Sequence, residues 1–416
     1  MAKRVIVIGG GIIGLSAALR LCQAGLRVTV IDTAGAPKAA SWGNAGHIAT
    51  EQVEPLASWP ILRSAPRRLF SAGGALALPP RQIRHWLPFA LGMIKASSPD
   101  RVVNGRAALR SLLCLALPAW RDLVAHLAAP DLLREDGHIV VWESAASAAA
   151  GLASWRAADT GTARFHECTK DELHAVASVI KQPLTAGIRF ENTGQIADLP
   201  KLANALRVSL TAQGVEIMPS TARDIEYGAG SATVTLTSGD RLSADLVVVA
   251  AGVRSAGLLK RFHASIPLIA ERGYHLQMPQ HHWPDLPPVA FEDRSMIVTR
   301  FESGLRAASF VEFSAVDAPP DSRKWQRLRE HVASLGLPGG PETVEWMGAR
   351  PTLPDYLPAI GRFPSAPSIL YAFGHQHLGL TLAAVTAQLV AQLATDAAPT
   401  VDLNPFNIQR FSAETK

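Results

Sequence analysis

A short apolar stretch near the N-terminus runs directly into a glycine-rich loop, and this pairing constrains the fold more than any other feature of the chain. Residues 5–8 read Val-Ile-Val-Ile, and Gly9, Gly11 and Gly14 follow with the spacing of a GxGxxG loop. The first glycine of such a loop permits a tight turn, the second lets backbone approach a pyrophosphate, and the third lets a helix pack on the strand. The sequence therefore predicts a strand–turn–helix unit that binds a dinucleotide.

The residues after the glycine loop complete this unit. A helix with one apolar face is predicted over residues 12–22, ending at Gly25, with a strand over 27–31 after it. Asp32 closes that strand, eighteen residues after the last glycine of the loop, near the spacing of a carboxylate that hydrogen-bonds a ribose hydroxyl. An acidic residue here disfavours a nucleotide with a 2′-phosphate, which leaves FAD and NAD as alternatives.

The size of the chain predicts two domains. Its 416 residues exceed the limit of about 250 to 300 residues for a single core, and 48% hydrophobic with 18% charged residues is typical of a globular protein. No stretch reaches the roughly 18 uninterrupted apolar residues of a membrane span, so we expect a protein that is soluble or bound at a membrane surface. Cys22, Cys114 and Cys168 contain no CxxC pair, which suits a reducing cytoplasm and predicts no metal.

Positive charge is concentrated in one part of the chain. The formal net charge is +5, but residues 61–110 hold nine basic side chains against one acid, so this stretch carries +8 and the remainder −3. Large apolar residues lie among the cations, a mixture that suits contact of residues 55–110 with an anionic membrane, for example the inner face of the cytoplasmic membrane. A solvated rim of a globular domain is the alternative. No nucleic-acid-binding module accompanies the charge, so nucleic acid is not an expected partner.

Later segments indicate further strands and helices of a nucleotide-binding domain. A helix is predicted near residues 107–128 and a strand over 137–142. Asp198 can cap a second helix, over 199–210. The apolar strand over 244–252 ends in small residues, as expected of a strand that is buried on both faces of a parallel sheet and passes close to a cofactor.

Four further segments, taken with the glycine loop and in this order, resemble the FAD-dependent amino-acid oxidoreductases. They are Ser41-Trp-Gly-Asn-Ala-Gly-His47, the strand end Ala-Ala-Gly252, Arg350-Pro-Thr-Leu-Pro-Asp355 and Gly374-His-Gln-His-Leu-Gly379. That family includes D-amino-acid oxidase, glycine oxidase and sarcosine oxidase, and the chain looks most similar to the bacterial D-amino-acid dehydrogenases. The likeness covers nearly the whole chain, and the order of the motifs makes it specific.

The resemblance implies a fold that combines α/β and α+β parts. A Rossmann-like FAD-binding domain is expected from the discontinuous segments 1–80, 193–265 and 346–416. A substrate domain, with a large mixed and mostly antiparallel sheet over the flavin ring, is expected from 81–192 and 266–345. The resemblance also implies non-covalent FAD and transfer of the substrate's α-hydrogen as hydride to flavin N5, so no dedicated base is required when the amine arrives neutral.

Four side chains are expected to act at the substrate. The resemblance makes Arg350 the anchor of the substrate carboxylate, which its planar guanidinium suits. Tyr274 falls where relatives place a hydroxyl on that carboxylate, although a half-buried core tyrosine is the alternative. His47 is expected near the flavin face, and His377 stands where relatives put a substrate-contacting side chain, an arginine in glycine oxidase. Metal binding by these histidines or His375 is not expected, because carboxylate partners and ligand spacing are absent.

The predicted FAD contacts combine the glycine loop with the segments that carry the resemblance. A helix predicted to begin at Gly379 would present its positive end to the flavin pyrimidine, where a helix dipole stabilises the anionic reduced ring. The residues expected to bind FAD are Gly9, Gly11, Ile12, Ile13, Gly14, Asp32, Thr33, Ser41, Asn44, Ala45, Gly46, His47, Ala222, Ala251, Gly252, Gly348, Gly374, His375, Gly379, Leu380 and Thr381.

These features predict oxidation of a D-amino acid, or of a cyclic relative such as D-proline or D-hydroxyproline, to an imine that hydrolyses or cyclises. The basic stretch and the resemblance to dehydrogenases favour a quinone as electron acceptor. The alternatives are the catalytic subunit of a hetero-oligomeric amine dehydrogenase for glycine, proline or an opine, an oxygen-using oxidase, and a nucleotide-binding regulatory protein, which would not need a carboxylate anchor such as Arg350. The substrate side chain, its chirality and a homo- or hetero-oligomeric state stay open.

Overall fold

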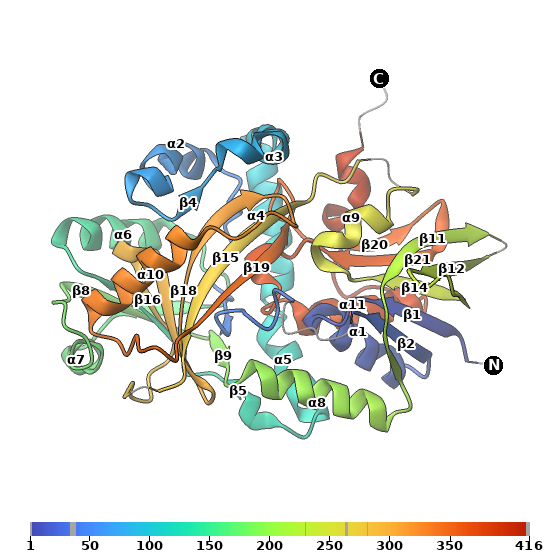
Figure 1. Ribbon diagram of the computed structural model, residues 1–416, viewed down its shortest axis with the longest axis horizontal. Coiled ribbons are helices and arrows are strands. Elements are labelled where there is room, and N and C mark those ends of the chain that lie inside the picture. The colour runs from blue at the N-terminus through green and yellow to red at the C-terminus, as the bar shows by residue number, and fades with distance from the viewer. Residues whose placement is uncertain (1, 34–38, 229, 263–264, 281, 413–416) are drawn as a thin grey trace.

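Two large sheets lie toward opposite ends of the long axis of the molecule (Figure 1). The computed structural model describes residues 2–33, 39–228, 230–262, 265–280 and 282–412. The loop that follows Asp32 therefore falls partly outside the described residues. The predicted fold class, a Rossmann-like sheet with a large and mostly antiparallel second sheet, is confirmed.

The first sheet has six strands in the order β10-β2-β1-β14-β21-β20, and all of its pairings except β20 with β21 are parallel. Its strands come from three separate parts of the chain, as predicted. The central strand β14 is buried along its whole length, because a parallel sheet is covered on both faces. The strands are β1 (Arg4–Ile8), β2 (Arg27–Asp32), β10 (Glu216–Pro219), β14 (Leu246–Val249), β20 (Ala359–Phe363) and β21 (Ala366–Phe373).

Helices cover one face of this sheet, and a small sheet of three strands covers the other. Val5 and Val7 of β1 pack in one core with the helices, whereas Ile6 and Ile8 pack with the small sheet, as the two-residue period of a strand requires. Asp198 caps α8 as predicted, since its side chain accepts the Lys201 backbone N–H at 2.8 Å. The covering elements are α1 (Ile12–Gln23), α8 (Leu199–Ala212) and α11 (Ala383–Ala394), opposite β11 (Ala222–Gly228), β12 (Ser231–Leu236) and β13 (Arg241–Ala244), with α9 (Ser255–Leu258) beside β11.

The second sheet follows the order β19-β15-β18-β17-β16-β6-β8-β7, with β4 added beside β18. Only β16 with β6 and β18 with β4 pair in parallel. Helix α10 packs on β15 and β18, and α6 packs on β6 and β8 (Figure 1). The elements are β4 (Leu76–Ala77), β6 (His138–Trp142), β7 (Arg164–Glu167), β8 (Ala186–Glu191), β15 (Ile269–Met278), β16 (Val289–Phe291), β17 (Met296–Phe301), β18 (Gly304–Ser314), β19 (Val344–Thr352), α6 (Ala145–Ala157), α7 (Lys170–Ala177) and α10 (Ser322–Leu335).

Two of these strands come from segments that we predict for the FAD-binding domain. β19 pairs with β15 along nearly its whole length, which takes residues 346–352 into the second sheet, and β4 joins the same sheet. The boundaries predicted after residues 80 and 345 therefore do not match the hydrogen bonding. Motif residues indicate where a site lies, whereas strand partners are set by tertiary pairing.

The helical segment predicted near 107–128 is divided into two helices. α4 (Pro99–Leu113) and α5 (Ala116–His126) are separated by Cys114 and Leu115. Pro118 explains the break, because proline has no N–H to donate to the carbonyl four residues earlier and its ring crowds that carbonyl. The predicted start of the last long helix is also wrong. A 3₁₀ turn, η7 (Gln376–Leu378), lies within the motif that runs from Gly374 to Gly379, and α11 begins only at Ala383 instead of Gly379.

One stretch, Pro99–His126, is long and apolar enough to cross a membrane. Within the fold, however, 44% of its most apolar window is buried. Trp120 is fully buried, and its indole N–H donates to the carbonyls of Leu380 and Thr381 at 3.1 and 3.2 Å. We therefore assign α4 and α5 to the core.

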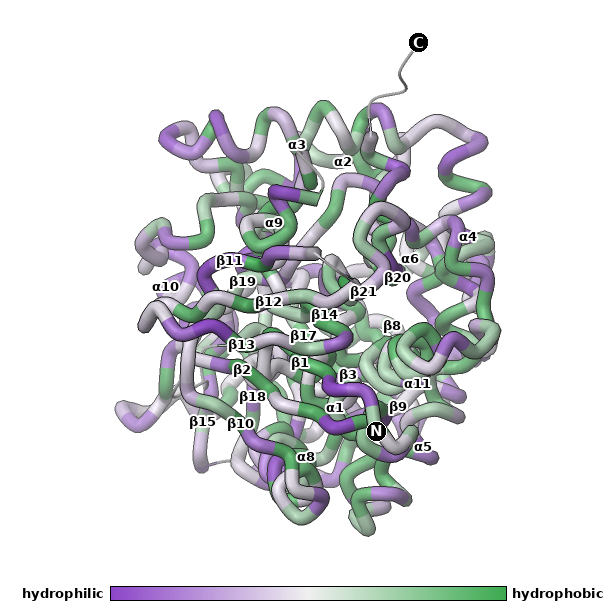
Figure 2. Tube along the Cα trace, turned by 90° about the vertical axis from the view of Figure 1, so that its right-hand side faces the viewer, coloured by the Kyte–Doolittle hydropathy of each residue, from purple (hydrophilic) through white to green (hydrophobic). Residues whose placement is uncertain are grey.

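A fourth sheet, also small, joins segments that are far apart in the chain. It has the order β3-β9-β5, from β3 (His47–Ile48), β9 (Gly194–Ile196) and β5 (Leu133–Arg134). β9 also bonds to the loop over residues 41–46, which we call the family loop, since the Ile196 N–H donates to the Gly46 carbonyl at 2.8 Å. Helices α2 (Trp59–Arg68) and α3 (Ile83–Ala96) lie apart from this small sheet, at the outer edge of the molecule in both views (Figures 1 and 2).

Candidate functional site

The glycine loop brings α1 and β1 into direct contact. A Cβ on Gly14 would lie 1.8 Å from the Gly9 carbonyl oxygen, and a Cβ on Gly9, which has φ +114°, would lie 2.3 Å from the Ala250 carbonyl oxygen. Gly11 stands at the helix N-cap and offers no side chain there, although the Ile12 N–H donates to the Ser41 hydroxyl at 3.0 Å. The positive end of α1 is thus built for an anion such as a pyrophosphate.

Asp32 lies beside this loop, where a ribose would be held. A Cβ on Gly10 would lie 2.4 Å from Asp32 Oδ2, so the unsubstituted Gly10 gives the carboxylate its place. Sequence reasoning missed Gly10, although the run of three glycines was visible. The Arg207 guanidinium lies 3.7 Å from the same carboxylate oxygen. The glycines therefore let the loop, α1 and Asp32 pack together, in the arrangement that binds the ADP part of a dinucleotide such as FAD.

The other predicted contacts for this part of FAD lie at the same edge of the sheet. β1, β2, β10 and β14 are parallel, so the residues just after their carboxyl ends are neighbours. Gly9, Thr33 and Ala251 follow three of these strands, and Ala222 begins β11 shortly after β10. The Ser220 N–H donates to the Asp32 carbonyl at 2.9 Å. Ligands of open parallel sheets bind at this carboxyl edge.

Strands of the second sheet hold the loop over residues 41–46. The Trp346 indole lies between two glycines, since a Cβ on Gly43 or on Gly348 would come within 2.2 or 1.9 Å of it. His275 stacks on that indole at 4.8 Å, and its Nδ1 lies 3.0 Å from the Gly43 carbonyl oxygen. Arg306 donates to the carbonyls of Trp42 and Asn44. Sequence reasoning missed Trp346, His275 and Arg306.

Arg350 projects from β19 into a space that the facing strand leaves open. A Cβ on Gly273 would lie 2.2 Å from Arg350 Nη2, so glycine is needed opposite the guanidinium. Arg350 Nη1 donates to Glu271 at 2.8 Å, and Thr352 donates to the other oxygen of Glu271 at 3.0 Å. The Arg350 side chain remains 27% exposed, whereas Glu271 is buried. Arg350 is therefore held in place and still accessible to a carboxylate.

Three of the four predicted substrate residues converge. The turn that carries His377 is joined to β19 by a β-bridge between Thr352 and His375. The segment after His47 is joined to the same turn region, because the Ala49 N–H donates to the Thr381 hydroxyl at 2.9 Å. Burial lowers the pKa of His377 to about 4, and the charges of Glu271, Arg350, Glu51 and His47 also act on it. His377 therefore lies near both the Arg350–Glu271 pair and the His47–Glu51 pair.

The prediction for Tyr274 is wrong. Glu271 and Gly273 share the β15 face that meets Arg350, and Tyr274 points to the opposite face because strand residues alternate. Its hydroxyl donates to Glu312 at 3.2 Å and accepts from Arg272 at 2.9 Å. The ring is 1% exposed and packs in the core under α10. Tyr274 therefore belongs to a buried polar network on the far side of the sheet.

His375 has a structural role for its side chain. It is buried, and its Nε2 lies 3.0 Å from the Thr386 hydroxyl of α11. Burial lowers its pKa to about 3. Any contact of this position with FAD is left to its backbone. The FAD contacts predicted for individual residues, Ile13, Ala45, Gly46, Gly252, Gly374, Gly379 and Leu380 among them, stay predictions.

Two further side chains near His47 were missed. Glu51 follows His47 by four residues, and its Oε1 lies 3.1 Å from His47 Nε2. His138 of β6 has its Nε2 4.0 Å from the same oxygen, and its ring centroid lies 4.3 Å from that of His47. The premise that the histidines have no carboxylate partner is thus wrong for His47. Its relation to Glu51 was visible as a spacing of four, whereas His138 is too distant in the chain to be seen.

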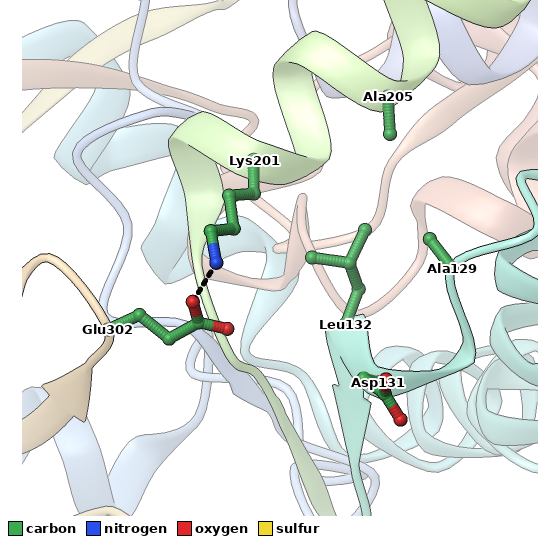
Figure 3. A pocket seen from close by; sticks show the side chains of 6 residues that line it. All are labelled: Ala129, Asp131, Leu132, Lys201, Ala205 and Glu302. Atoms are coloured by element: carbon green, nitrogen blue, oxygen red, sulfur yellow. Dashed lines mark hydrogen bonds and ion pairs between the residues drawn. The ribbon is translucent and has the colours of Figure 1, made fainter.

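A surface hollow of about 310 Å³ lies elsewhere, between α8, the segment before β5 and the turn after β17 (Figure 3). Lys201 and Glu302 pair with each other on one side of it. The hollow contains none of the predicted site residues, so we do not assign the active site to it. It is lined by Ala129, Asp131, Leu132, Lys201, Ala205 and Glu302.

Comparison with known proteins identifies relatives along nearly the whole chain. The chain is 30% identical to a D-amino-acid oxidase of Bradyrhizobium diazoefficiens, covering 98% of this chain and 99% of the relative. It is 28% identical to D-amino acid dehydrogenase 2 of Ralstonia nicotianae, covering 98% and 100%. Both likenesses run over essentially the full length of the proteins compared.

Solved structures share the fold. Glycine oxidase from Geobacillus kaustophilus superposes with a TM-score of 0.71 at 21% identity, covering 99% of this chain and 100% of that one. Iminodiacetate oxidase from Chelativorans sp. gives 0.70 at 20% identity, covering 97% and 98%. The DAO family model, described as FAD dependent oxidoreductase, matches residues 4–393. The chain therefore belongs to the DAO family of FAD-dependent oxidoreductases, and its cofactor is FAD.

Proposed function

We propose that this enzyme oxidises a D-amino acid at the Cα–N bond and gives an imine that hydrolyses or cyclises. The observation that carries the proposal is Arg350, an accessible guanidinium fixed by buried Glu271 in the space above Gly273. The relatives named D-amino-acid oxidase and D-amino acid dehydrogenase support an amino acid of D configuration. Cyclic substrates such as D-proline and D-hydroxyproline are included, because an anchor for the carboxylate does not depend on the class of amine.

Each residue of the site has a separate role in binding and orienting the substrate. FAD, when bound, supplies the hydride acceptor for the substrate's α-hydrogen. Arg350 binds the carboxylate and so orients Cα, a task for which a fixed guanidinium fork is suited. Glu271 is itself held by Thr352 and by the Tyr356 hydroxyl at 3.4 Å, so the fork has a fixed direction. His377, whose pKa is lowered to about 4, is neutral at pH 7 and adds no charge that would compete with Arg350 for the carboxylate.

Replacing the anchor tests the proposal. In anaerobic titrations, Arg350→Ala is expected to raise the amino-acid concentration for half-reduction of the flavin by roughly 10- to 100-fold, since hydrogen bonds to charged groups are worth about 1.5–3 kcal/mol. Arg241→Ala is the matched control, because Arg241 pairs with Glu226 at the surface of β13. Equal half-reduction concentrations in wild type and Arg350→Ala would remove Arg350 from the substrate site.

We further propose that electrons pass to a quinone, with the enzyme docked on the inner face of the cytoplasmic membrane. Helix α3 buries Phe89 and Met93 but exposes a stripe of apolar side chains spaced to share its outer face. These are Ile83, Leu87, Leu91 and Ile94, which are 48%, 43%, 59% and 45% exposed, with Trp59 of α2 45% exposed nearby in the chain. Exposed basic residues on α2, α3 and the adjoining turns, Arg63, Arg67, Arg68, Arg81, Arg84 and Lys95, supply charge complementary to anionic lipid.

Vesicle sedimentation tests this docking. The enzyme is expected to sediment with vesicles containing phosphatidylglycerol and not with pure phosphatidylcholine vesicles. Leu87→Glu/Leu91→Glu should abolish sedimentation, whereas Val208→Glu, on the equally exposed outer face of α8, should not. A purified enzyme that never sediments and reduces oxygen as fast as a quinone analogue would instead support an oxidase, the activity in the name of the Bradyrhizobium relative. Activity of the chain purified alone would argue against an obligatory partner subunit.

A further inference from the structure

A largely buried cluster of three polar side chains, one of them the predicted substrate residue His47, offers the donor atoms of a metal site. It consists of His47, Glu51 and His138, which come from β3, the segment after it, and β6. One nitrogen or oxygen atom from each residue lies within 4.8 Å of the other two. We propose that this cluster binds one divalent first-row transition metal ion, with zinc as the expected occupant.

Both imidazoles are held so that Nε2 points into the cluster. His47 Nδ1 lies 3.2 Å from the Gly194 carbonyl oxygen, which can only accept, so Nδ1 carries the proton and Nε2 keeps a lone pair for a cation. His138 Nδ1 lies 3.0 Å from the Thr193 hydroxyl. Histidines that bind metal are almost always oriented by such a bond to the second ring nitrogen.

The carboxylate in the cluster has an oxygen without a partner. Glu51 Oε1 lies 3.1 Å from His47 Nε2, and because neither atom carries a proton when His47 is neutral, a proton or a cation must lie between them. Glu51 Oε2 is buried and has no hydrogen-bond partner among the described residues. The side chains of Glu51 and His138 are 1% and 5% exposed. A protonated His47 paired with Glu51 would satisfy Oε1 and still leave Oε2 unpaired, at a cost of about 1–3 kcal/mol or more. A divalent cation bound by the three residues would offset the charge of this carboxylate, which Oε2 shares.

Size and donor type select the ligand. Because Oε2 exposes less than 1 Å², an ammonium group carried on a substrate cannot reach it, whereas the donor atoms of the three residues lie within 4.8 Å of one another, close enough to share a single ion. Two imidazoles and one carboxylate are a zinc ligand set that leaves a fourth position open. Magnesium and calcium prefer oxygen ligands alone.

The ion would have a structural effect at the site. β3 directly follows the family loop that ends at Gly46, whereas β6 lies in the second sheet. A metal held by His47 and His138 therefore ties the loop to that sheet. Zinc has no redox chemistry, so the ion positions residues and takes no part in electron transfer. The proposal does not depend on which amino acid the enzyme oxidises.

Metal analysis of the FAD-loaded enzyme tests the proposal. After dialysis against micromolar zinc and then metal-free buffer, wild type is expected to retain about one zinc per chain. Glu51→Gln and His138→Asn should each lower zinc content at least about tenfold. Loss of a residue that only orients a ligand lowers metal affinity about 10- to 100-fold, and loss of the ligand itself should lower it more. His166→Asn is the matched control, because His166 also lies near two acids, Glu172 and Glu191, but at the surface. Its zinc content should equal that of wild type.

A second measurement uses wild type alone, so that it does not depend on the folding of the variants. Cobalt added to zinc-free holoenzyme should give a visible absorption band of tetrahedral or five-coordinate cobalt, saturating at one equivalent and removed by zinc. The proposal is overturned if wild type retains less than about a tenth of an equivalent of zinc and shows no saturable cobalt band. It is equally overturned if His166→Asn loses as much metal as Glu51→Gln. Neither readout involves turnover, so failure here and failure of the proposed function are distinguishable.

Discussion

Tyr274 does not reach Arg350, because neighbouring residues of strand β15 point to opposite faces of the sheet. Glu271 lies opposite Arg350 in the pairing of β15 with β19, so odd-numbered residues of β15 face the guanidinium and Tyr274 faces α10. Arg350 and Tyr274 could both be recognised in the sequence. The register between β15 and β19, however, is set by tertiary packing. His138 could not be predicted for the same reason, because it lies close to His47 only in the folded chain. Arg350 could be predicted because its motif is local.

Removing the Tyr274 hydroxyl separates the two roles considered for it. Tyr274→Phe takes away a group that bonds Arg272 and Glu312, two buried charges, so unfolding stability is expected to fall by about 1–3 kcal/mol. The amino-acid concentration for half-reduction of the flavin should stay within about twofold of wild type, because the hydroxyl lies on the far face of the sheet. A rise as large as that of Arg350→Ala would restore Tyr274 to the substrate site.

Elements defined by local signals are predictable from this sequence. The strand, glycine loop and first helix, the α8 helix capped by Asp198, and the buried strand β14 all appear as predicted. The break between α4 and α5 had a visible cause in Pro118 and was overlooked. No residue in the sequence indicates the late start of α11. Gly379 itself adopts a helical conformation, and the chain makes two further hydrogen-bonded turns before the regular helix begins.

Substitution of Gly14 tests the close contact between α1 and β1. In Gly14→Ala the new Cβ would lie 1.8 Å from a backbone oxygen, so α1 must move away from β1 and its N-terminus from the cofactor. We expect weaker FAD retention on gel filtration and a lower melting temperature, since overpacking costs about 1–3 kcal/mol. Gly257→Ala is the control, because a Cβ at Gly257 meets nothing within 4 Å. Equal FAD retention in the two variants would argue against this cradle.

The whole molecule depends on contacts that no local pattern reveals. The second sheet reaches across to the family loop through Trp346, His275 and Arg306, and β3 and β9 join segments more than a hundred residues apart. Domain boundaries predicted from motifs missed this, because β19 carries a site motif and belongs to the second sheet. The sequence thus reveals which chemistry is present, whereas the assembly of the site follows from packing between the sheets.

Buried histidines make the stability of the whole molecule sensitive to acid. Burial lowers the pKa of His138 and His375 from 6.5 to about 3, and that of His377 to about 4. Between about pH 6.5 and pH 4 the unfolded chain therefore binds protons that the folded chain does not, so stability falls as pH falls through this window, by about 1.4 kcal/mol per pH unit for each histidine.

Melting temperatures measured between pH 7.5 and pH 5 test this linkage. The melting temperature should decrease steadily below about pH 6.5, and His375→Gln, which cannot titrate but can still bond Thr386, should show a shallower decrease. A melting temperature that is independent of pH across this range would contradict the neutral, buried state of these side chains.

The central claim, that this DAO-family enzyme oxidises D-amino acids anchored by Arg350, is tested most directly by anaerobic bleaching of the flavin absorption. The purified holoenzyme is mixed with matched D and L enantiomers, including both configurations of proline and hydroxyproline. We expect at least one D enantiomer to bleach the flavin while its L counterpart at the same concentration does not. Bleaching by L enantiomers alone, or by simple amines without a carboxylate as readily as by any amino acid, would contradict it.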